Sequence, residues 1–438
     1  MASQRVWNAR VINPGTGAVI DHGTLAWENG VLTDVSEARG DPPEGAIDVG
    51  GRVVLPGLID AHVHLISDLE RSPGFGPPPQ LHGEDPRPRE LGYLLLAQSC
   101  AALLEAGITT VRDVGSYDDE AIVIRRAIEL GLVRGPTVRT CGRIIAATSP
   151  GGKMFGTMYV EADGPWAMRR AVREQLRRGA DYVKFMSTGA RSVEREDPEP
   201  AQLTREEIAA LIDEAHRLGL RVAAHAEGLE GARLAIEEGV DTVEHGFSLH
   251  REPRLLALMA ERGQVLVPTL TTFHDLAERF APQWLPRLVD QAKRQLEEAY
   301  ETLGAARDAG VALAMGFDSG PPGANLWELV RMAEGGLGSM GALAAATSGG
   351  SAALGLPERG RFAVGAAADI VVVDGDPLED IRTLLRPQRI WLVIRDGKGV
   401  AGQMLARPTL GGEFAGPDEE LAPPTGPAAP CCSVCSGA

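Results

Sequence analysis

The pattern of hydrophobic and polar positions changes twice along the 438-residue chain. Residues 5–56, and again the stretch after residue 359, show short alternating apolar runs broken by Gly, Pro and Asn, which is typical of small antiparallel strands and hairpins. Between them, residues 57–358 alternate apolar strand-like runs with longer amphipathic helical patterns, such as residues 205–219. We therefore expect a large central α/β domain and one small β module that the two chain ends build together.

The central region contains eight apolar runs with helical patterns between them. They are residues 57–65, 109–116, 137–146, 181–190, 221–228, 241–248, 264–273 and 311–320. Eight β/α units favour a closed (β/α)8 TIM barrel over an open doubly wound sheet. No G-x-G-x-x-G fingerprint follows the first run, which argues against dinucleotide binding. The fold class that we predict is α/β, a TIM barrel with a small β-sandwich module.

The predicted division of the chain has four parts. Residues 1–56 and 359–410 are the two parts of the β module, and residues 57–358 are the barrel. Residues 411–438 form a Pro-, Gly- and Cys-rich tail with little apolar material for a core, so we expect it to be flexible. Its three cysteines lack a fourth ligand nearby and match structural zinc spacing poorly; they are Cys431, Cys432 and Cys435.

The composition narrows the range of partners. There are 43 Lys and Arg residues against 60 Asp and Glu residues, giving a formal charge of −17, which disfavours nucleic acid and anionic membranes. No apolar run approaches the roughly 18 residues of a membrane helix, and residues 1–15 lack the apolar core of a signal peptide. We expect a cytoplasmic protein, in which Cys100 and Cys141 are buried core residues rather than a disulfide.

Six side chains with metal-binding or acid-base chemistry lie at or near the carboxyl ends of the predicted strands, where barrel enzymes place their active sites. They are His62, His64, Lys184, His225, His245 and Asp318. Each has an ordinary alternative: a satisfied core histidine, a lysine that reaches solvent, or a capping aspartate. Together they would be repulsive or unsatisfied unless a cation gathered them, so the sequence predicts a metal site.

Five motifs carry a family resemblance: "DAHVH", "VKFMSTGA", "AAHAEG", "VEHG" and "GFDSG", in this order. With them the chain resembles the amidohydrolase superfamily, and more narrowly its imidazolonepropionase-related and Xaa-Pro dipeptidase-like branch, whose members carry a carboxylated lysine on strand four. The run "GAAADIVVVDGDPLEDI" is similar to that branch's C-terminal signature. The resemblance covers about residues 5–410.

The resemblance implies two divalent metal ions. His62, His64 and Asp318 would hold one ion, His225 and His245 the other, and Lys184, carboxylated by carbon dioxide, would bridge them. A carbamate converts a buried cation into an anionic two-oxygen ligand, and Zn²⁺ suits a set rich in imidazoles. A hydroxide between the ions would be the nucleophile, and Asp318 would accept and then deliver the proton. The branch also allows for a homo-oligomer.

The function that follows is hydrolysis of a C–N bond, of amide, peptide or amidine type, in a small peptide, an N-acyl amino acid or a modified peptide. An ester, a lactone, a carbamate or a xenobiotic amide is the alternative substrate, because a metal hydroxide does not itself choose among carbonyls. A deaminase fits less well, since that chemistry usually works without a bridging lysine. The non-enzyme alternative is a metal-containing binding scaffold, although no predicted ligand is missing.

The substrate pocket departs from the branch. Relatives usually read "TGG" and "GTDSG" where this chain has Gly189-Ala190 and Phe317, and residues 147–159 contain no histidine. Residues 72–88 read as a Pro- and Gly-rich loop that could act as a lid. Candidate substrate contacts follow strands at the catalytic rim; they are Lys153, Tyr159, Arg191, His250 and His274. The guanidinium of Arg191 is suited to gripping a carboxylate.

Overall fold

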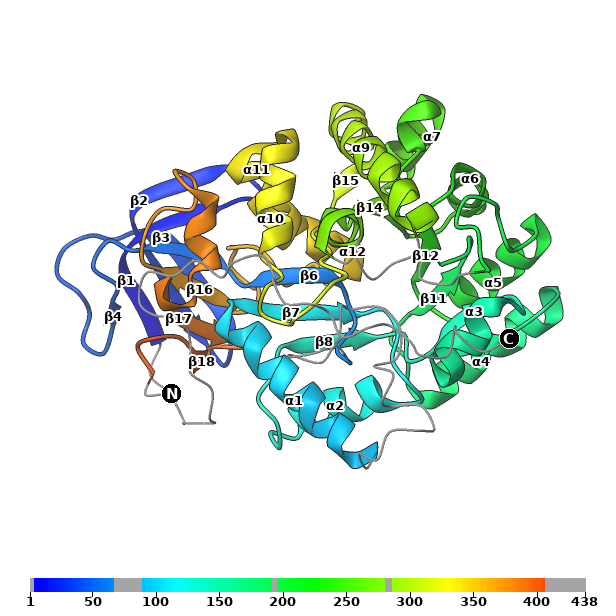
Figure 1. Ribbon diagram of the computed structural model, residues 1–438. Helices are drawn as coiled ribbons and strands as arrows, with labels where there is room; N and C mark the ends of the chain where they lie inside the picture. The colour runs from blue at the N-terminus through cyan, green and yellow to red at the C-terminus, as the bar shows by residue number, and fades with distance from the viewer. Residues whose placement is uncertain (1–3, 67–88, 191–194, 280–285, 406–438) are drawn as a thin grey trace.

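The computed structural model describes residues 4–66, 89–190, 195–279 and 286–405. Its elements form a β module, made from both ends of the chain, and an α/β barrel beside it (Figure 1). Within these residues no helix has the length and apolar character needed to cross a membrane. The predicted lid at residues 72–88 and the predicted tail at residues 411–438, with its three cysteines, lie outside the described residues.

The barrel strands lie at the eight predicted runs, with β7 starting one residue earlier than its run, and the paired strands are parallel. They are β6 (Leu58–Val63), β7 (Ile108–Asp113), β8 (Thr137–Thr140), β9 (Ile144–Ala146), β11 (Val183–Met186), β12 (Val222–Ala226), β13 (Thr242–His245), β14 (Val265–Val267) and β15 (Ala312–Leu313). Strands such as β6 and β12 are buried at every residue. Burial on both faces is expected of parallel strands enclosed by helices and explains their continuous apolar runs.

The third predicted run is divided in two. Residues 141–143 separate β8 from β9, so that β8 pairs with β7 and β9 pairs with β11. A short additional strand, β10 (Tyr159–Glu161), pairs with the outer side of β9. The N–H of Asp181, just before β11, donates to the carbonyl of Thr140 at the end of β8 at 2.8 Å, so a hydrogen bond still links these two sides of the break.

The first and eighth strand positions close the barrel. The N–H of Ala61 donates to the carbonyl of Met315 at 2.8 Å, and the N–H of Asp318 donates to the carbonyl of His62 at 2.9 Å. β15 is much shorter than the predicted run at residues 311–320, because the chain leaves β14 after Ala314, whose N–H donates to the carbonyl of Leu266 at 3.0 Å, and bonds to β6 instead. The predicted (β/α)8 architecture is confirmed.

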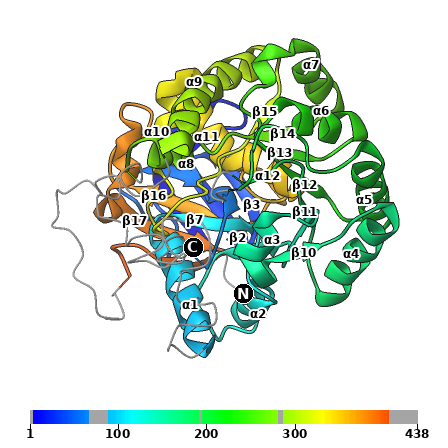
Figure 2. The same cartoon turned by 45° about the vertical axis from the view of Figure 1, so that its right-hand side comes forward.

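Helices surround the strands, and Figure 2 shows α4 to α7 and α9 around the outside of the barrel. The helices are α1 (Arg89–Glu105), α2 (Glu120–Glu129), α3 (Pro150–Phe155), α4 (Pro165–Arg178), α5 (Arg205–Arg217), α6 (Leu229–Glu238), α7 (Pro253–Arg262), α8 (Leu270–His274), α9 (Pro286–Asp308), α10 (Trp327–Met332), α11 (Gly338–Ala344) and α12 (Gly350–Leu354). Local sequence sets their ends. A capping box between Thr204 and Glu207 starts α5, and Gly239, at φ 93°, ends α6 in the left-handed conformation that glycine adopts readily.

The β module is one eight-stranded sheet. Its strands are β1 (Gln4–Asn13), β2 (Ala18–Glu28), β3 (Val31–Glu37), β4 (Ile47–Asp48), β5 (Val53–Pro56), β16 (Ile370–Val373), β17 (Ile390–Arg395) and β18 (Lys398–Ala401). The order is β18-β17-β16-β5-β1-β2-β3, with β4 also on β1, so antiparallel β16 and β5 join the two chain ends as predicted. A bridge from Val31 to Ala367 brings β3 back toward the segment before β16, around a shared apolar core.

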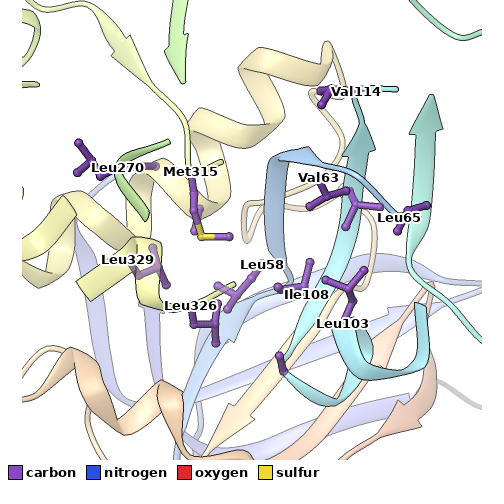
Figure 3. Close-up of a cluster of buried hydrophobic side chains, with 14 of the residues drawn as sticks. Leu58, Val63, Leu65, Leu103, Ile108, Val114, Leu270, Met315, Leu326 and Leu329 are labelled. Atoms are coloured by element: carbon purple, nitrogen blue, oxygen red, sulfur yellow. The ribbon is translucent and has the colours of Figure 1, made fainter. Parts of the chain in front are cut away.

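Close packing joins the module to the barrel. An apolar cluster containing Leu58, Leu103 and Ile108 (Figure 3) continues to Val371 and Val393 of the module. Gly57, between β5 and β6, has no room for a side chain, since a Cβ there would lie 2.1 Å from Oγ1 of Thr109. Cys100 and Cys141 are both free and buried, as the sequence indicated.

Candidate metal centre

The Nε2 atoms of His62 and His64 both point toward Asp318. Nδ1 of His62 lies 2.8 Å from Oε2 of Glu244, and Nδ1 of His64 lies 2.8 Å from the carbonyl of Gly115. Nε2 of each ring is therefore left to face Oδ1 of Asp318, at 3.3 Å from His62 and 3.6 Å from His64. Successive side chains of an extended chain point to opposite faces, so the spacing of two positions between the histidines accounts for this convergence.

Asp318 presents an unsatisfied carboxylate oxygen to these rings. Its Oδ1 is buried and makes no hydrogen bond with any described residue. Burial alone would raise the pKa of Asp318, but the neighbouring His62 lowers it below its ordinary value, so the side chain is an anion. The ligand atoms of His62, His64 and Asp318 all lie within 4.8 Å of one another. Two imidazole nitrogens and one carboxylate oxygen fit a divalent cation such as Zn²⁺.

His225 and His245 form a second convergent pair. Nδ1 of His225 lies 2.9 Å from Nε2 of His245, while the other nitrogens are engaged at 3.1 Å with the carbonyl of Gly189 and at 2.7 Å with Oγ1 of Thr269. The ring of His245 is 5.2 Å from that of His62, so the two pairs are adjacent. Burial, with Lys184 nearby, lowers the pKa of His225 to about 3, which keeps its ring neutral and able to bind a cation.

Lys184 projects from β11 into the same region. Its side chain is buried, and none of the described residues forms a hydrogen bond or ion pair with its ammonium. Burial lowers the pKa of Lys184 below its ordinary value. Lys184 lies on β11 beside β12, which carries His225, and its charge contributes to the pKa of His62, His64 and His225. The six predicted ligands thus lie together at the carboxyl end of the barrel strands, although their coordination of metal stays a prediction.

The backbone around the site is strained at three non-glycine residues. Their φ angles are 72° at His245, 49° at Thr269 and 46° at Asp318, all in the left-handed region. Each such residue costs about 1–3 kcal/mol, and such residues concentrate at functional sites. The carbonyl of Asp318 accepts a hydrogen bond from the hydroxyl of Thr272 on α8, which helps to hold that conformation.

Asp60 supports the residues that carry the site. Its Oδ1 accepts hydrogen bonds from the N–H of His62 at 3.0 Å and of Phe317 at 3.3 Å, and its Oδ2 accepts one from Asn325 at 2.8 Å. Burial raises the pKa of Asp60 to about 6 despite these donors. Asp60 therefore links the backbones on which His62 and Asp318 are carried.

Sequence reasoning missed two buried charged residues. Arg112 of β7 and Glu244 of β13 pair inside the barrel, with 2.6 Å between Nη2 and Oε1. Each is a charged residue inside an otherwise apolar strand run, the same signal that drew attention to Lys184. Glu244 stands next to His245, which was selected as the metal ligand of that strand. Arg112 was not selected because a guanidinium does not bind metal ions.

Two predicted substrate contacts lie in the segment after β9. Lys153 is an exposed residue of α3, and Tyr159 is buried and stacks on Phe155, with ring centroids 4.9 Å apart. The charges of Glu196 and Glu227 add to burial in raising the pKa of Tyr159 well above its ordinary value. Glu227 itself lies 3.5 Å from Nε2 of His225. Arg191 lies outside the described residues.

The other two predicted contacts face α9. Nδ1 of His250 lies 2.9 Å from the hydroxyl of Thr302, and its Nε2 lies 2.9 Å from Glu301. Nε2 of His274 lies 2.8 Å from the hydroxyl of Tyr300. The structure therefore joins both rings to α9 and does not bring them into the cluster of six, and their role in substrate binding stays a prediction.

Comparison with known proteins agrees with this site. Residues 53–400 match the family model described as the amidohydrolase family. An ochratoxinase of Aspergillus niger is 30% identical over 378 residues, or 79% of this chain and 75% of that protein. An imidazolonepropionase of Paracoccus denitrificans is 29% identical over 394 residues, or 81% of this chain and 87% of that protein.

A solved structure extends the likeness to nearly the whole chain. A prolidase crystallised with N-methylphosphonate-L-proline has a TM-score of 0.81 and 30% sequence identity, covering 92% of this chain and 100% of that one. The match to the family model includes β6 to β15 and therefore all six residues of the candidate metal centre. The chain belongs to the amidohydrolase family and is a hydrolase.

Proposed function

We propose that the protein is a binuclear metal-dependent hydrolase that cleaves the amide-type C–N bond of a small peptide, an N-acyl amino acid or a modified peptide. The observation that carries the proposal is the pairing of the four imidazoles. Nε2 of His62 and His64 face Asp318, while Nδ1 of His225 faces Nε2 of His245. Two adjacent sets of donors support two cation sites, for which Zn²⁺ is the proposed metal.

Lys184 is the proposed bridge between the two sites. Its burial among the ligands favours the neutral amine, which is the form that attacks carbon dioxide. The amine forms a C–N bond to carbon dioxide, loses one proton and becomes a carbamate with one negative charge. Two oxygens of that anion would then face the two donor sets, in place of an ammonium that has no partner among the described residues.

Asp318 is the proposed proton carrier. Divalent ions in these sites would polarise the scissile carbonyl and lower the pKa of water by many units. Oδ1 of Asp318 is buried and accepts no hydrogen bond from the described residues, so it can take a proton from the attacking water. The same oxygen would then give that proton to the nitrogen that leaves, which completes amide hydrolysis without a further acid.

The relatives support the substrate class. The ligand of the related prolidase, N-methylphosphonate-L-proline, carries a tetrahedral phosphorus on the proline nitrogen, the geometry expected halfway through hydrolysis of an amide. The related ochratoxinase favours a second candidate substrate for this chain, a non-peptide natural product. A cytoplasmic location and a homo-oligomer remain predictions from the sequence.

Protein reconstituted with Zn²⁺ and bicarbonate tests the proposal. It is offered Xaa-Pro dipeptides, N-acyl amino acids and ochratoxin in parallel, with mass-spectrometric detection of the released amine. We expect turnover of at least one class, about two ions per chain, and loss of both after removal of metal by a chelator. Two bound ions with no hydrolysis of any amide would contradict the proposed substrate class, and at most one ion would contradict the binuclear centre.

A further inference from the structure

A network of hydrogen bonds around one ion pair, Arg112 with Glu244, lies inside the barrel beside the candidate metal centre. Nε of Arg112 donates to the carbonyl of Ala61 at 2.6 Å, Nη1 to the hydroxyl of Thr242 at 2.9 Å, and Nη2 to Oε1 of Glu244 at 2.6 Å. The hydroxyl of Thr242 donates to the same carboxylate oxygen at 2.5 Å. The side chains of Arg112 and Glu244 are 3% and 0% exposed, so water does not weaken this pair.

The network ends on one metal-binding ring. Oε2 of Glu244, the carboxylate oxygen that Arg112 does not use, lies 2.8 Å from Nδ1 of His62. The corresponding nitrogens of the other three rings bond to neutral oxygens, the carbonyls of Gly115 and Gly189 and the hydroxyl of Thr269. His62 therefore has a carboxylate at hydrogen-bond distance on the nitrogen that faces away from the cluster, whereas on that side of His225 the carboxylate of Glu227 lies farther away, at 3.5 Å.

This arrangement selects one tautomer of His62. An ionised carboxylate can only accept, so Nδ1 of His62 carries the hydrogen and the lone pair of Nε2 faces Asp318. The negative charge of Glu244 also makes Nε2 more electron-rich, which increases its affinity for a cation. Arg112 in turn fixes the carboxylate and bonds to the carbonyl of Ala61, the residue before His62.

We propose that Glu244, held in place by Arg112, is a positioning residue that fixes the tautomer and the orientation of His62 and strengthens cation binding on the His62 side of the centre. This inference rests on the proposed metal-dependent function. The competing explanation is that the ion pair only braces β7 against β13. A brace would affect the stability of the fold and leave metal affinity unchanged, so the two explanations predict different measurements.

The experiment measures Zn²⁺ affinity by competition with a chromophoric chelator in wild type, Glu244→Gln and two matched controls. Asp369→Asn removes the acid of another ion pair, Arg359 with Asp369, whose side chains are 14% and 2% exposed and which lies in the β module. Thr269→Val removes the hydroxyl behind His245, on the other side of the centre. Melting temperatures are recorded without metal, so that loss of fold stability is measured separately.

We expect Glu244→Gln to lower the affinity for one of the two Zn²⁺ ions by about 10- to 100-fold, as is usual when the hydrogen-bond partner behind a metal ligand is lost. Asp369→Asn should lower the melting temperature and leave both Zn²⁺ affinities unchanged. Thr269→Val should lower the affinity for the other Zn²⁺ ion. Unchanged affinities in Glu244→Gln, with a melting temperature lowered as in Asp369→Asn, would overturn the inference and leave the proposed function standing. Wild-type protein that binds no Zn²⁺ would overturn both.

A second measurement needs no folded variant at position 244. In metal-free wild-type protein labelled with ¹⁵N-histidine, long-range ¹H–¹⁵N correlations report which nitrogen of each ring carries the hydrogen, and His62→Asn assigns the signal. We expect His62 to carry a hydrogen on Nδ1, whether or not Nε2 is also protonated opposite Asp318. A hydrogen on Nε2 of His62 with none on Nδ1 would overturn the inference even if Glu244→Gln failed to fold.

Discussion

Oδ1 of Asp318 lies 3.3 Å from Nε2 of His62, and it is buried without a hydrogen bond to the part of the chain that the structure describes. A carboxylate oxygen in this position is available both to a cation and to a proton. The main chains of the two residues are joined directly, since the N–H of Asp318 donates to the carbonyl of His62 at 2.9 Å. Barrel closure and site assembly therefore depend on the same pair of residues.

Asp318→Asn tests the proposed proton carrier. Asparagine keeps the size of the side chain but has neither the charge nor the basicity of the carboxylate, so we expect kcat to fall by about 100- to 10,000-fold. Metal content, measured by mass spectrometry, should fall as well. Asp369→Asn, a buried acid of the β module, is the control and should retain kcat. If Asp318→Asn kept more than about a tenth of the wild-type kcat, another residue would have to carry the proton.

Lys184→Ala tests the proposed bridge. Without a carbamate the two donor sets share no ligand, so we expect the chain to keep fewer than two ions and to lose nearly all activity. Formate or acetate, which can supply two carboxylate oxygens in the vacated space, should restore part of both. The exposed Lys293 of α9 provides the control, because Lys293→Ala should change neither quantity. Full metal content and activity in Lys184→Ala would rule out the bridge.

The carbamate itself can be observed in the wild-type protein. Growth or reconstitution with ¹³C-bicarbonate should give one carbamate carbon signal in the NMR spectrum, which Lys184→Ala should lack. No such signal from protein that holds two ions would show that the ions need no carboxylated lysine.

Much of the site followed from where ligand-type residues stand in the sequence. Four histidines, Lys184 and Asp318, all at or near the carboxyl ends of predicted strands, pointed to a cation before any geometry was known. The pairing of Arg112 with Glu244 could not be predicted in this way, because it joins β7 to β13 across the barrel interior and no local pattern encodes that distance.

The fold was predictable to a similar extent. Eight strand positions and the union of the two chain ends follow from periodicity alone. The break after β8 and the shortness of β15 do not, since both depend on hydrogen bonds with distant strands. His250 and His274 were selected for lying after strands, and their contacts with α9 depend on how that long helix packs.

Glu328 gives the metal-free fold a pH dependence. It is fully buried and accepts hydrogen bonds from the N–H groups of Leu270 and Thr271 at 2.8 and 2.7 Å, yet burial raises its pKa from 4.5 to about 7. Between these values the folded protein holds a proton that the unfolded chain releases. The stabilising contribution of protonated Glu328 is therefore complete below pH 4.5 and is lost as pH rises toward 7.

Glu328→Gln isolates that contribution because the amide stays neutral. We expect the free energy of unfolding of the wild type, relative to this variant, to fall by roughly 3 kcal/mol between pH 4.5 and pH 7.5. Urea unfolding of both metal-free proteins at several pH values measures the difference. Parallel curves for the two proteins would mean that Glu328 titrates at its ordinary pKa in the fold.

Gly57 and Gly304 offer the same substitution in opposite settings. A Cβ at Gly57 would lie 2.1 Å from Oγ1 of Thr109, whereas a Cβ at Gly304, within α9, would meet no atom within 4 Å. We expect Gly57→Ala to cost about 1–3 kcal/mol of stability by overpacking the junction of module and barrel. Gly304→Ala should gain about 0.5–1 kcal/mol, because alanine favours the helix. Thermal unfolding measures both effects. Equal melting temperatures of Gly57→Ala and Gly304→Ala would show that the junction of module and barrel accommodates a methyl group at little cost.

Thr272→Val tests whether α8 holds Asp318 in its strained conformation. The hydroxyl of Thr272 donates to the carbonyl of Asp318, whose φ is 46°, and valine keeps the shape of threonine without that donor. Loss of one such bond allows Asp318 to leave its working position, so we expect kcat to fall by about tenfold, with KM and metal content unchanged. Thr271→Val is the matched control, since the hydroxyl of Thr271 on the same helix bonds instead to Glu328, at 2.7 Å. That change should lower the melting temperature more than kcat, and an equal loss of kcat in both variants would assign the effect to the helix as a whole rather than to the bond with Asp318.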